Sequence, residues 1–147
     1  MKQTFLTEDG ETFTNEWLNC PTDISEYWGF VYKITNLTNN KKYIGRCNFW
    51  AIEKKKPLKG RVNKRHVKKE TKWRDYFGSG GKEWQEVLTK IGKENIRREI
   101  LVLCSSKWEV KYREAELQFK LGVLLKEEYY NGIIDLKLPK APKDLRI

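Results

Sequence analysis

The sequence contains few of the residues that build disulfide frameworks or zinc sites. Its 147 residues include three cysteines, Cys20, Cys47 and Cys104, and a single histidine, His66. The cysteines lie far apart and form no C-x-x-C pair, so the pattern indicates neither a disulfide scaffold nor a zinc site. Idle thiols of this kind are typical of a reducing compartment, and we expect a cytoplasmic protein.

Long apolar runs are also absent. No segment approaches the roughly 20 apolar residues that cross a bilayer, and the first residues lack the apolar core of a secretory signal. We therefore expect a protein that is neither secreted nor embedded in a membrane.

Acidic side chains are in the minority. Thirty Lys and Arg face 20 Asp and Glu, which gives a net charge of +10, and aromatic residues make up 13% of the chain. The aromatic content indicates a folded core rather than a disordered tail. A basic excess of this size favours a polyanionic partner, most often nucleic acid, and the alternative is a basic protein without such a partner.

The basic residues gather in residues 46–75. This stretch holds thirteen Arg, Lys and His residues against three acidic ones, and we expect part of it to be helical, interrupted at Pro57 and Gly60. It is the predicted nucleic-acid-binding surface, acting mainly on phosphates. The candidate contacts are Arg46, Lys54, Lys55, Lys56, Lys59, Lys64, Lys68 and Lys69.

Short strands are indicated in several places. Residues 4–14 alternate β-formers around Asp9-Gly10 and predict an N-terminal hairpin. Residues 29–35 and 41–45 predict a second hairpin, and the apolar run within residues 96–104 predicts a central strand.

Helices are indicated on either side of that strand. A helix opening near residue 81 carries Trp84, Val87, Leu88 and Ile91 on one stripe and is capped by Gly92. A capping box of Ser106 and Glu109 starts a second helix that runs to about Leu125. It has two apolar stripes, so we expect it to be sandwiched between other elements. One stripe is Trp108, Tyr112, Ala115 and Phe119, and the other is Val110, Leu117, Leu121 and Leu124.

These elements predict an α+β fold with a small, mainly antiparallel three-stranded sheet flanked by helices. We expect an N-terminal hairpin extension at residues 1–27, a domain at 28–134 and a tail at 135–147.

Two tyrosines are spaced so that they fall on the two strands of the second predicted hairpin. Gly29-Phe30-Val31-Tyr32 is followed, after ten residues, by Tyr43-Ile44-Gly45. In a hairpin the two rings can face each other across the strands and simply fill a core. The alternative is chemical: a phenol whose pKa is lowered by nearby Arg or Lys could deprotonate or orient a water.

This spacing resembles the signature of the GIY-YIG nucleases. Three further elements resemble the same family: Tyr76-Phe77-Gly78-Ser79-Gly80, the run from Lys90 to Asn95 followed by REIL, and Tyr129-Tyr130-Asn131. The resemblance covers about residues 29–134 and is nearest to free-standing homing-type endonucleases of tailed phages.

The resemblance implies hydrolysis of a phosphodiester bond in double-stranded DNA with one divalent metal ion, Mg²⁺ or another such as Mn²⁺. Tyr32 matches the first motif tyrosine and is the expected general base, and Tyr43 is expected to orient water or phosphate. Gly29 and Gly45 match the motif glycines, and a side chain at Gly45 would crowd the site.

The other family roles have more than one candidate. The arginine on the scissile phosphate is Arg61 or, by our preference, Arg65, and His66 or Tyr76 could share the proton relay. The metal carboxylate is Glu114 or Glu116, and we favour Glu114. Gly78, Ser79 and Asn131 match motif positions, and Asn131 is as much a structural as a functional candidate.

Two other functions fit the same residues: a catalytically inactive DNA-binding protein that keeps the fold, and an RNA-binding protein. If the chain is an active nuclease, one site cuts one strand, so a double-strand cut requires a homodimer or two binding events.

Overall fold

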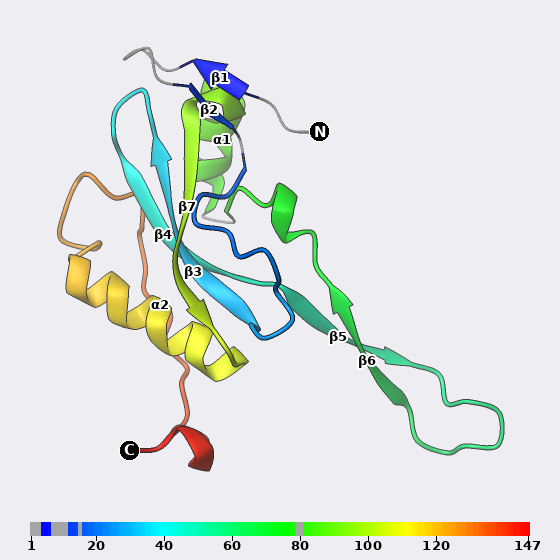
Figure 1. Cartoon of the computed structure of the whole chain (residues 1–147). Coiled ribbons are helices and arrows are strands. Elements are labelled where there is room, and N and C mark those ends of the chain that lie inside the picture. Colours follow the sequence, from blue (N-terminus) through cyan, green and yellow to red (C-terminus); the bar gives the residue numbers. More distant parts are fainter. Residues whose placement is uncertain (1–3, 7–11, 15, 79–80) are drawn as a thin grey trace.

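A three-stranded antiparallel sheet forms the centre of the molecule. The computed structural model describes residues 4–6, 12–14, 16–78 and 81–147. The sheet contains β3 (Gly29–Asn36), β4 (Lys42–Asn48) and β7 (Ile96–Cys104) in the order β4-β3-β7. The expected α+β class with a small antiparallel sheet is confirmed (Figure 1).

The central strand is β3, so the expectation that residues 96–104 would be central is wrong. Seven of the eight β3 residues are buried, because both faces of this strand are covered. Strand β7 lies at the edge, where Leu18 donates its N–H to the carbonyl of Arg98 and accepts one from Ile100. The apolar run in β7 therefore reflects a covered edge rather than a central place.

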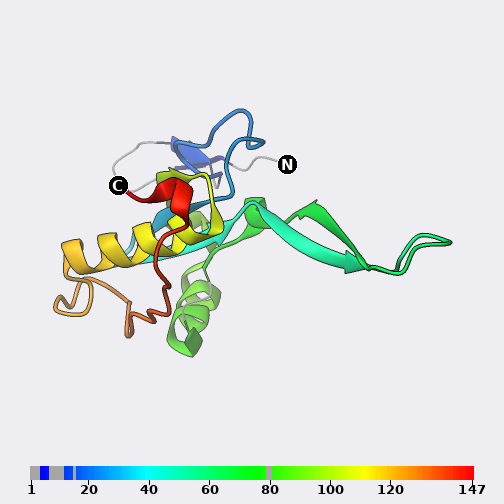
Figure 2. The same cartoon turned by 90° about the horizontal axis from the view of Figure 1, so that it is seen from below.

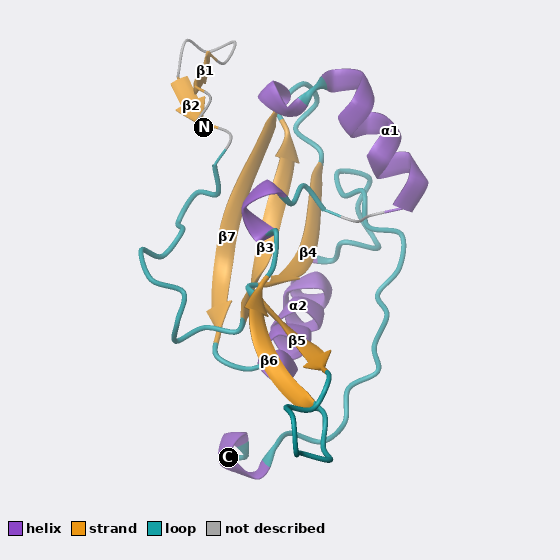
Figure 3. Cartoon of the chain, turned by 90° about the vertical axis from the view of Figure 1, so that its right-hand side faces the viewer, coloured by secondary structure: helices purple, strands orange, loops and turns teal. Residues whose placement is uncertain are grey.

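The two helices pack on opposite faces of the sheet (Figure 3). Phe30 and Tyr32 of β3 point into a core with Trp84 of α1 (Gly81–Ile91). Val31 points to the other side, into a core with Val110 of α2 (Lys107–Leu121). This alternation is the period of two expected of a strand with both faces buried.

The ends of both helices follow their sequence signals, with one exception. Gly92 has a φ of 79° and closes α1, as expected. Ser106 Oγ accepts the N–H of Glu109 at 3.1 Å, so the expected N-cap is confirmed. Helix α2 ends at Leu121, four residues earlier than expected, because Gly122 adopts the left-handed conformation with φ 64°.

Helix α2 is not sandwiched, contrary to the expectation from its two apolar stripes. Phe119 is 62% exposed, and Leu124 lies beyond the helix end. Trp108 and Tyr112 stack on each other at 5.1 Å, and Trp108 Nε1 donates to the carbonyl of Pro139. The stripe that contains Trp108 and Tyr112 therefore receives the C-terminal tail instead of another layer of the core.

Most of the basic stretch folds as strands, and the expected helical part is limited to the 3₁₀ turn η1 (Trp73–Asp75) at its end. Strands β5 (Trp50–Lys55) and β6 (Arg65–Glu70) pair as a two-stranded antiparallel hairpin that projects from the body (Figures 1 and 2). Strand β5 follows β4 almost directly and stays extended. Pro57 and Gly60, with φ 85° at Gly60, fall in the connecting loop.

The first and last segments both contact the central body. Strands β1 (Thr4–Leu6) and β2 (Thr12–Thr14) pair as the expected hairpin, while its turn at Asp9-Gly10 lies outside the described residues. Trp17 is buried in the core beside Phe30. A 3₁₀ turn, η3 (Lys143–Leu145), lies near the C-terminus. The division at residues 27 and 134 stays a prediction.

Two buried amides complete the hydrogen bonds of β4. Asn131 Nδ2 donates to the carbonyl of Ile44 at 2.8 Å, and Asn131 Oδ1 accepts the N–H of Ile44 at 3.0 Å. Gln118 Nε2 on α2 donates to the same carbonyl at 3.0 Å. The side chain of Asn131 thus acts as a short extra strand, and its predicted structural role is confirmed.

Replacing Asn131 should destabilise the fold. Asn131→Ala leaves the buried N–H of Ile44 without a partner, so we expect the free energy of unfolding to fall by about 2 kcal/mol. Denaturant unfolding followed by circular dichroism measures this change. Asn63→Ala, in the exposed loop of the β5–β6 hairpin, is the control and should leave stability unchanged. Equal stability of both variants would contradict the role of Asn131.

Candidate active site

The sheet register brings the two motif tyrosines onto one face. Tyr32 lies opposite Gly45 and Ile34 lies opposite Tyr43, so the tyrosines are diagonal neighbours. Their ring centroids are 6.2 Å apart. A third ring, Tyr76, stands 6.0 Å from Tyr32, edge to face. The three phenols form the tyrosine cluster, and the expected proximity of Tyr32 and Tyr43 is confirmed.

Tyr76 reaches the cluster from a separate loop. It follows η1 (Trp73–Asp75), and its carbonyl accepts a hydrogen bond from Arg98 Nη1 at 2.7 Å. The same nitrogen donates to the carbonyl of Arg74 at 2.9 Å. Arg98 is buried between the rings of Trp17 and Phe77, which lowers its pKa to about 10. A buried guanidinium therefore fixes the loop that carries Tyr76.

Two motif glycines leave space for the Tyr32 side chain. A Cβ atom on Gly45 would overlap the Tyr32 hydroxyl and lie 2.6 Å from its Cζ. A Cβ on Gly78 would lie 3.4 Å from the same hydroxyl, and Gly78 has a φ of 90°. The expectation that a side chain at Gly45 would crowd the site is confirmed. Gly29 packs instead against the backbone of Cys47, and Ser79 lies outside the described residues.

An ion pair lies on the α2 face of the sheet, opposite the face that carries the tyrosine cluster, and its charges act on Tyr43 across the edge strand β4. Arg46, three residues after Tyr43 on β4, donates from Nη1 to Glu114 Oε1 on α2 at 2.9 Å. The Glu114 side chain is 14% exposed, and its charge is felt at the Tyr43 hydroxyl. Glu116 instead pairs with Arg113 at 3.0 Å on an exposed part of α2. Of the two predicted carboxylates, only Glu114 acts on a motif tyrosine.

Burial shifts the protonation of this site. Desolvation raises the pKa of Tyr43 and raises that of Tyr32 well above its usual range. The condition for a phenolate base, a pKa lowered by neighbouring cations, is therefore not met. Burial also raises the pKa of Glu114, and the Arg46 guanidinium partly offsets this effect. The structure holds neutral phenols and a carboxylate that is costly to ionise.

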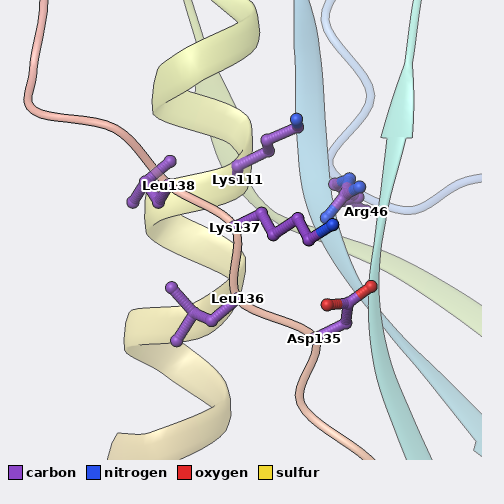
Figure 4. Close-up of a pocket in the computed structure, with 6 residues that line it drawn as sticks. All are labelled: Arg46, Lys111, Asp135, Leu136, Lys137 and Leu138. Atoms are coloured by element: carbon purple, nitrogen blue, oxygen red, sulfur yellow. The ribbon is translucent and has the colours of Figure 1, made fainter.

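A small pocket opens beside the ion pair. It has a volume of about 190 Å³ and receives side chains from β4, α2 and the C-terminal tail (Figure 4). Its lining residues are Arg46, Lys111, Asp135, Leu136, Lys137 and Leu138. Three cations against one carboxylate make the pocket suitable for an anionic group such as a phosphate.

Other predicted site residues lie elsewhere. Arg61, Arg65 and His66 belong to the projecting β5–β6 hairpin and its loop, where Arg65 Nε donates to the carbonyl of Lys56 at 3.4 Å. Counting from Tyr43 failed because the intervening residues form this hairpin rather than a helix. The structure does not bring these three side chains to the tyrosine cluster, and the arginine that pairs with Glu114 is Arg46.

Sequence reasoning also missed residues that support the site. Arg46 had been assigned to DNA binding because it opens the basic stretch, although it directly follows the Tyr43-Ile44-Gly45 motif. Gln118 gave no motif signal, and Arg98 begins the REIL element but was given no role of its own. The available signal was a polar residue among apolar ones on a helix face or strand, because a buried polar side chain usually forms hydrogen bonds to other buried groups.

The site offers one carboxylate for a metal ion. Among the described residues, no group of three or more His, Cys, Asp or Glu side chains could hold a metal. Mg²⁺ is commonly held by one or two carboxylates, with water and substrate phosphates completing its shell. Glu114, mostly buried yet next to the charged pocket, fits that type of donor set.

Comparison with known proteins agrees with this arrangement. The family model described as "Putative endonuclease segE, GIY-YIG domain" matches residues 7–134. The chain belongs to the GIY-YIG family. This family hydrolyses phosphodiester bonds, so the chain is a GIY-YIG endonuclease, of the phage type that the sequence resembles. No curated protein and no solved structure matches the chain.

The described part of this GIY-YIG endonuclease contains no helix with the length and apolar character needed to span a membrane.

The Arg46–Glu114 pair predicts a shift in titration. Arg46→Gln should raise the pKa of Glu114 further, because it removes the cation that favours the carboxylate. Carboxyl ¹³C NMR of the metal-free protein measures this titration. Since the folded pKa already exceeds the ordinary value, ionising Glu114 costs stability as the pH rises through that range. Arg46→Lys should restore most of the effect.

Arg113→Gln is the matched control, because Arg113 pairs with the exposed Glu116. It should leave the Glu114 titration unchanged. A Glu114 pKa that does not respond to Arg46→Gln would show that the two side chains are not paired in solution.

Proposed function

We propose that this GIY-YIG endonuclease uses a divalent metal ion, Mg²⁺ or Mn²⁺, to hydrolyse phosphodiester bonds in double-stranded DNA. The observation that carries the proposal is the Arg46–Glu114 ion pair, whose charges act on Tyr43. It supports the proposal because a carboxylate that could hold a metal and a guanidinium that could bind a phosphate lie together at β4, the edge strand that also carries Tyr43.

Glu114 is the residue that would hold the ion. The bound metal would stabilise negative charge on the phosphate and lower the pKa of a water molecule. In its absence, Arg46 compensates the Glu114 carboxylate. Arg46 is 40% exposed, so its guanidinium can turn from Glu114 toward a phosphate oxygen. The same side chain can therefore serve the free site and the substrate-bound site.

The phenols act as neutral hydrogen-bonding groups in this proposal. Tyr43 is only partly buried, so its hydroxyl can contact and orient the attacking water. Tyr32 is 1% exposed and is hydrogen-bonded to Tyr76. Tyr32 therefore positions the other two phenols, which replaces our expectation that it is the general base.

The pocket next to Arg46 provides a place for the phosphate backbone. Lys111 lies one helical turn before Glu114 on α2, and Lys137 reaches the pocket from the tail (Figure 4). Both amino groups can contact a phosphate beside the one that is cut. The presence of Arg46, Glu114 and the three tyrosines at or next to β4 favours activity over the alternative of an inactive DNA-binding or RNA-binding protein.

A substitution at Glu114 should abolish cleavage. Glu114→Gln keeps the shape of the side chain and removes the charge that holds the metal, so nicking of supercoiled plasmid in Mg²⁺ should be lost. DNA affinity, measured by fluorescence anisotropy in the presence of a chelator, should remain. Glu116→Gln is the matched control and should cut normally, as it lies among exposed side chains.

The outcome discriminates between the candidate functions. Loss of activity in Glu116→Gln with an active Glu114→Gln would move the metal site by two residues. Chelator-resistant cutting by the unaltered protein would disprove metal dependence. The same assay on double-stranded RNA of equal sequence tests the RNA alternative.

The hydroxyl groups of the tyrosine cluster should matter for rate. Tyr43→Phe keeps the ring and removes the hydroxyl, so we expect kcat to fall at least tenfold, a transition-state cost of about 1.4 kcal/mol. Tyr32→Phe should cause a smaller loss, because Tyr32 acts through Tyr76. Tyr129→Phe is the control, because Tyr129 packs on the opposite face of the sheet from the tyrosine cluster. Full activity of the Tyr43 variant would mean that the rings only fill space.

A further inference from the structure

The β5–β6 hairpin has the charge and exposure of a nucleic-acid-binding element. Residues 50–70, here called the arm, comprise both strands and the loop at 56–64. Between residues 54 and 69 the sequence has nine Lys and Arg residues and no Asp or Glu. All arm side chains are exposed except Trp50, Pro57 and Val67. A two-stranded ribbon with no core of its own is marginally stable, so a partner surface would complete it.

The base of the arm is fixed to the body. Trp50 Nε1 donates to the carbonyl of Tyr27 at 3.0 Å, and Lys68 Nζ lies 4.3 Å from the centre of the Trp50 ring. Thr71 Oγ1 donates to the carbonyl of Asn48 at 2.6 Å. These contacts close the hairpin where it leaves β4. The direction of the arm is therefore set relative to the strand that carries Tyr43 and Arg46.

Both faces of the ribbon are basic. Residues opposite each other in the register share a face. Lys54, His66 and Lys68 therefore lie on one face, while Lys55, Arg65 and Lys69 lie on the other. A surface that follows a single phosphate backbone needs positive charge on one side only. Charge on both faces and at the loop is suited to a position between two rows of phosphates.

We propose that the arm lies in the major groove of duplex DNA, to one side of the cut. The ligand class rests on the proposed function, while the mode of binding rests on the arm itself. The major groove is about 12 Å wide and accepts a two-stranded β-ribbon, whereas the minor groove is about 6 Å wide. The strands of a ribbon are about 4.8 Å apart, so lysines on both faces reach the phosphates on either wall.

The length of the chain sets where the arm touches the DNA. From Arg46 to Lys54 is eight residues, or at most ~26 Å at ~3.3 Å per residue. From Arg46 to Gly60 is fourteen residues, or at most ~46 Å. With ~3.4 Å per base pair, these spans correspond to ~8 and ~14 base pairs. The arm therefore contacts the groove roughly one helical turn from the scissile phosphate.

The loop presents apolar side chains among its cations. Val62 is 94% exposed and Leu58 is 54% exposed, and both lie in the loop that connects β5 to β6. In the groove these side chains would meet base edges, where thymine methyl groups are the apolar contact available. The lysines hold the backbone without reading sequence, and the loop supplies a preference for particular bases.

Methylation protection tests the mode of binding directly. Dimethyl sulfate modifies guanine N7 in the major groove and adenine N3 in the minor groove. With the unaltered protein bound to a ~50-base-pair duplex in chelator, we expect guanine protection on one flank of the cleavage position, ~8–14 base pairs away. Adenine N3 on that flank should stay reactive. The cleavage position is mapped separately in Mg²⁺ on the same duplex.

A shortened arm provides the matched variant. Replacing residues 56–64 with Asn-Gly keeps a two-residue hairpin turn and removes the loop. The flanking guanine protection should contract toward the cut. Neutralising Lys54, Lys55, Lys56 and Lys59 to Gln should weaken binding on all sequences and reduce the slope of log affinity against log salt by roughly one unit per lost phosphate contact. The same change at Lys82, Lys90, Lys120 and Lys126, away from the arm, should have little effect.

Val62→Ser combined with Leu58→Ser tests base reading. It should reduce the preference among duplexes that differ only 8–14 base pairs from the cut, with little change in salt dependence. Protection of adenine N3 alone, symmetric protection, or a salt slope unaffected by the arm lysines would overturn the proposal. Because protection and affinity are measured without cleavage, an arm that fails these tests leaves the nuclease assignment intact. If the protein protects the flank but cuts no DNA, the proposed function fails and the binding mode of the arm stands.

Discussion

The contact between Tyr32 and the bare backbone of Gly45 is the constraint on which the site depends. Only glycine lets the Tyr32 ring lie flat across the neighbouring strand, because a Cβ would overlap the hydroxyl. With the ring in that place, its hydroxyl meets Tyr76, and Tyr43 packs diagonally beside it. The spacing of the two motifs in the sequence thus sets the strand register, and the register sets how the rings of Tyr32 and Tyr43 pack.

Around this contact, ionisable side chains are buried, so their charged forms lose favourable hydration. Burial opposes the charge on Glu114 and opposes the phenolates of both motif tyrosines. Arg46 relieves the carboxylate but leaves the phenols neutral. A cation that replaces Arg46 beside Glu114 would stabilise the carboxylate, because burial disfavours its charged form. That preparation for a positive ligand supports the metal-dependent mechanism better than phenolate chemistry does.

Local signals in the sequence were sufficient for much of the fold. The tyrosine hairpin, the Trp84 stripe and the Ser106 cap each depend on residues close together along the chain, and all three are confirmed. The errors involve distant partners. Strand β5 pairs with β6 across a loop, and local residue propensities do not predict such a pairing. Strand β7 is apolar because Leu18 covers its edge. Arg46 was misplaced because its partner Glu114 lies 68 residues away.

The closed edges of the central sheet limit how two copies of the protein could join. On β7 the edge is occupied near Leu18, and on β4 it is occupied by Asn131 and by backbone hydrogen bonds between Lys42 and residues 128–130. A strand from a neighbouring molecule would find backbone groups already bonded at Lys42 and Ile44 on β4 and at Arg98 and Ile100 on β7. Lysines line the hairpin arm, so like charges discourage its pairing with a second arm. Assembly by continuous sheet extension, the usual route to fibrous aggregates, is therefore disfavoured, and any homodimer would have to form through helices, loops or shared DNA.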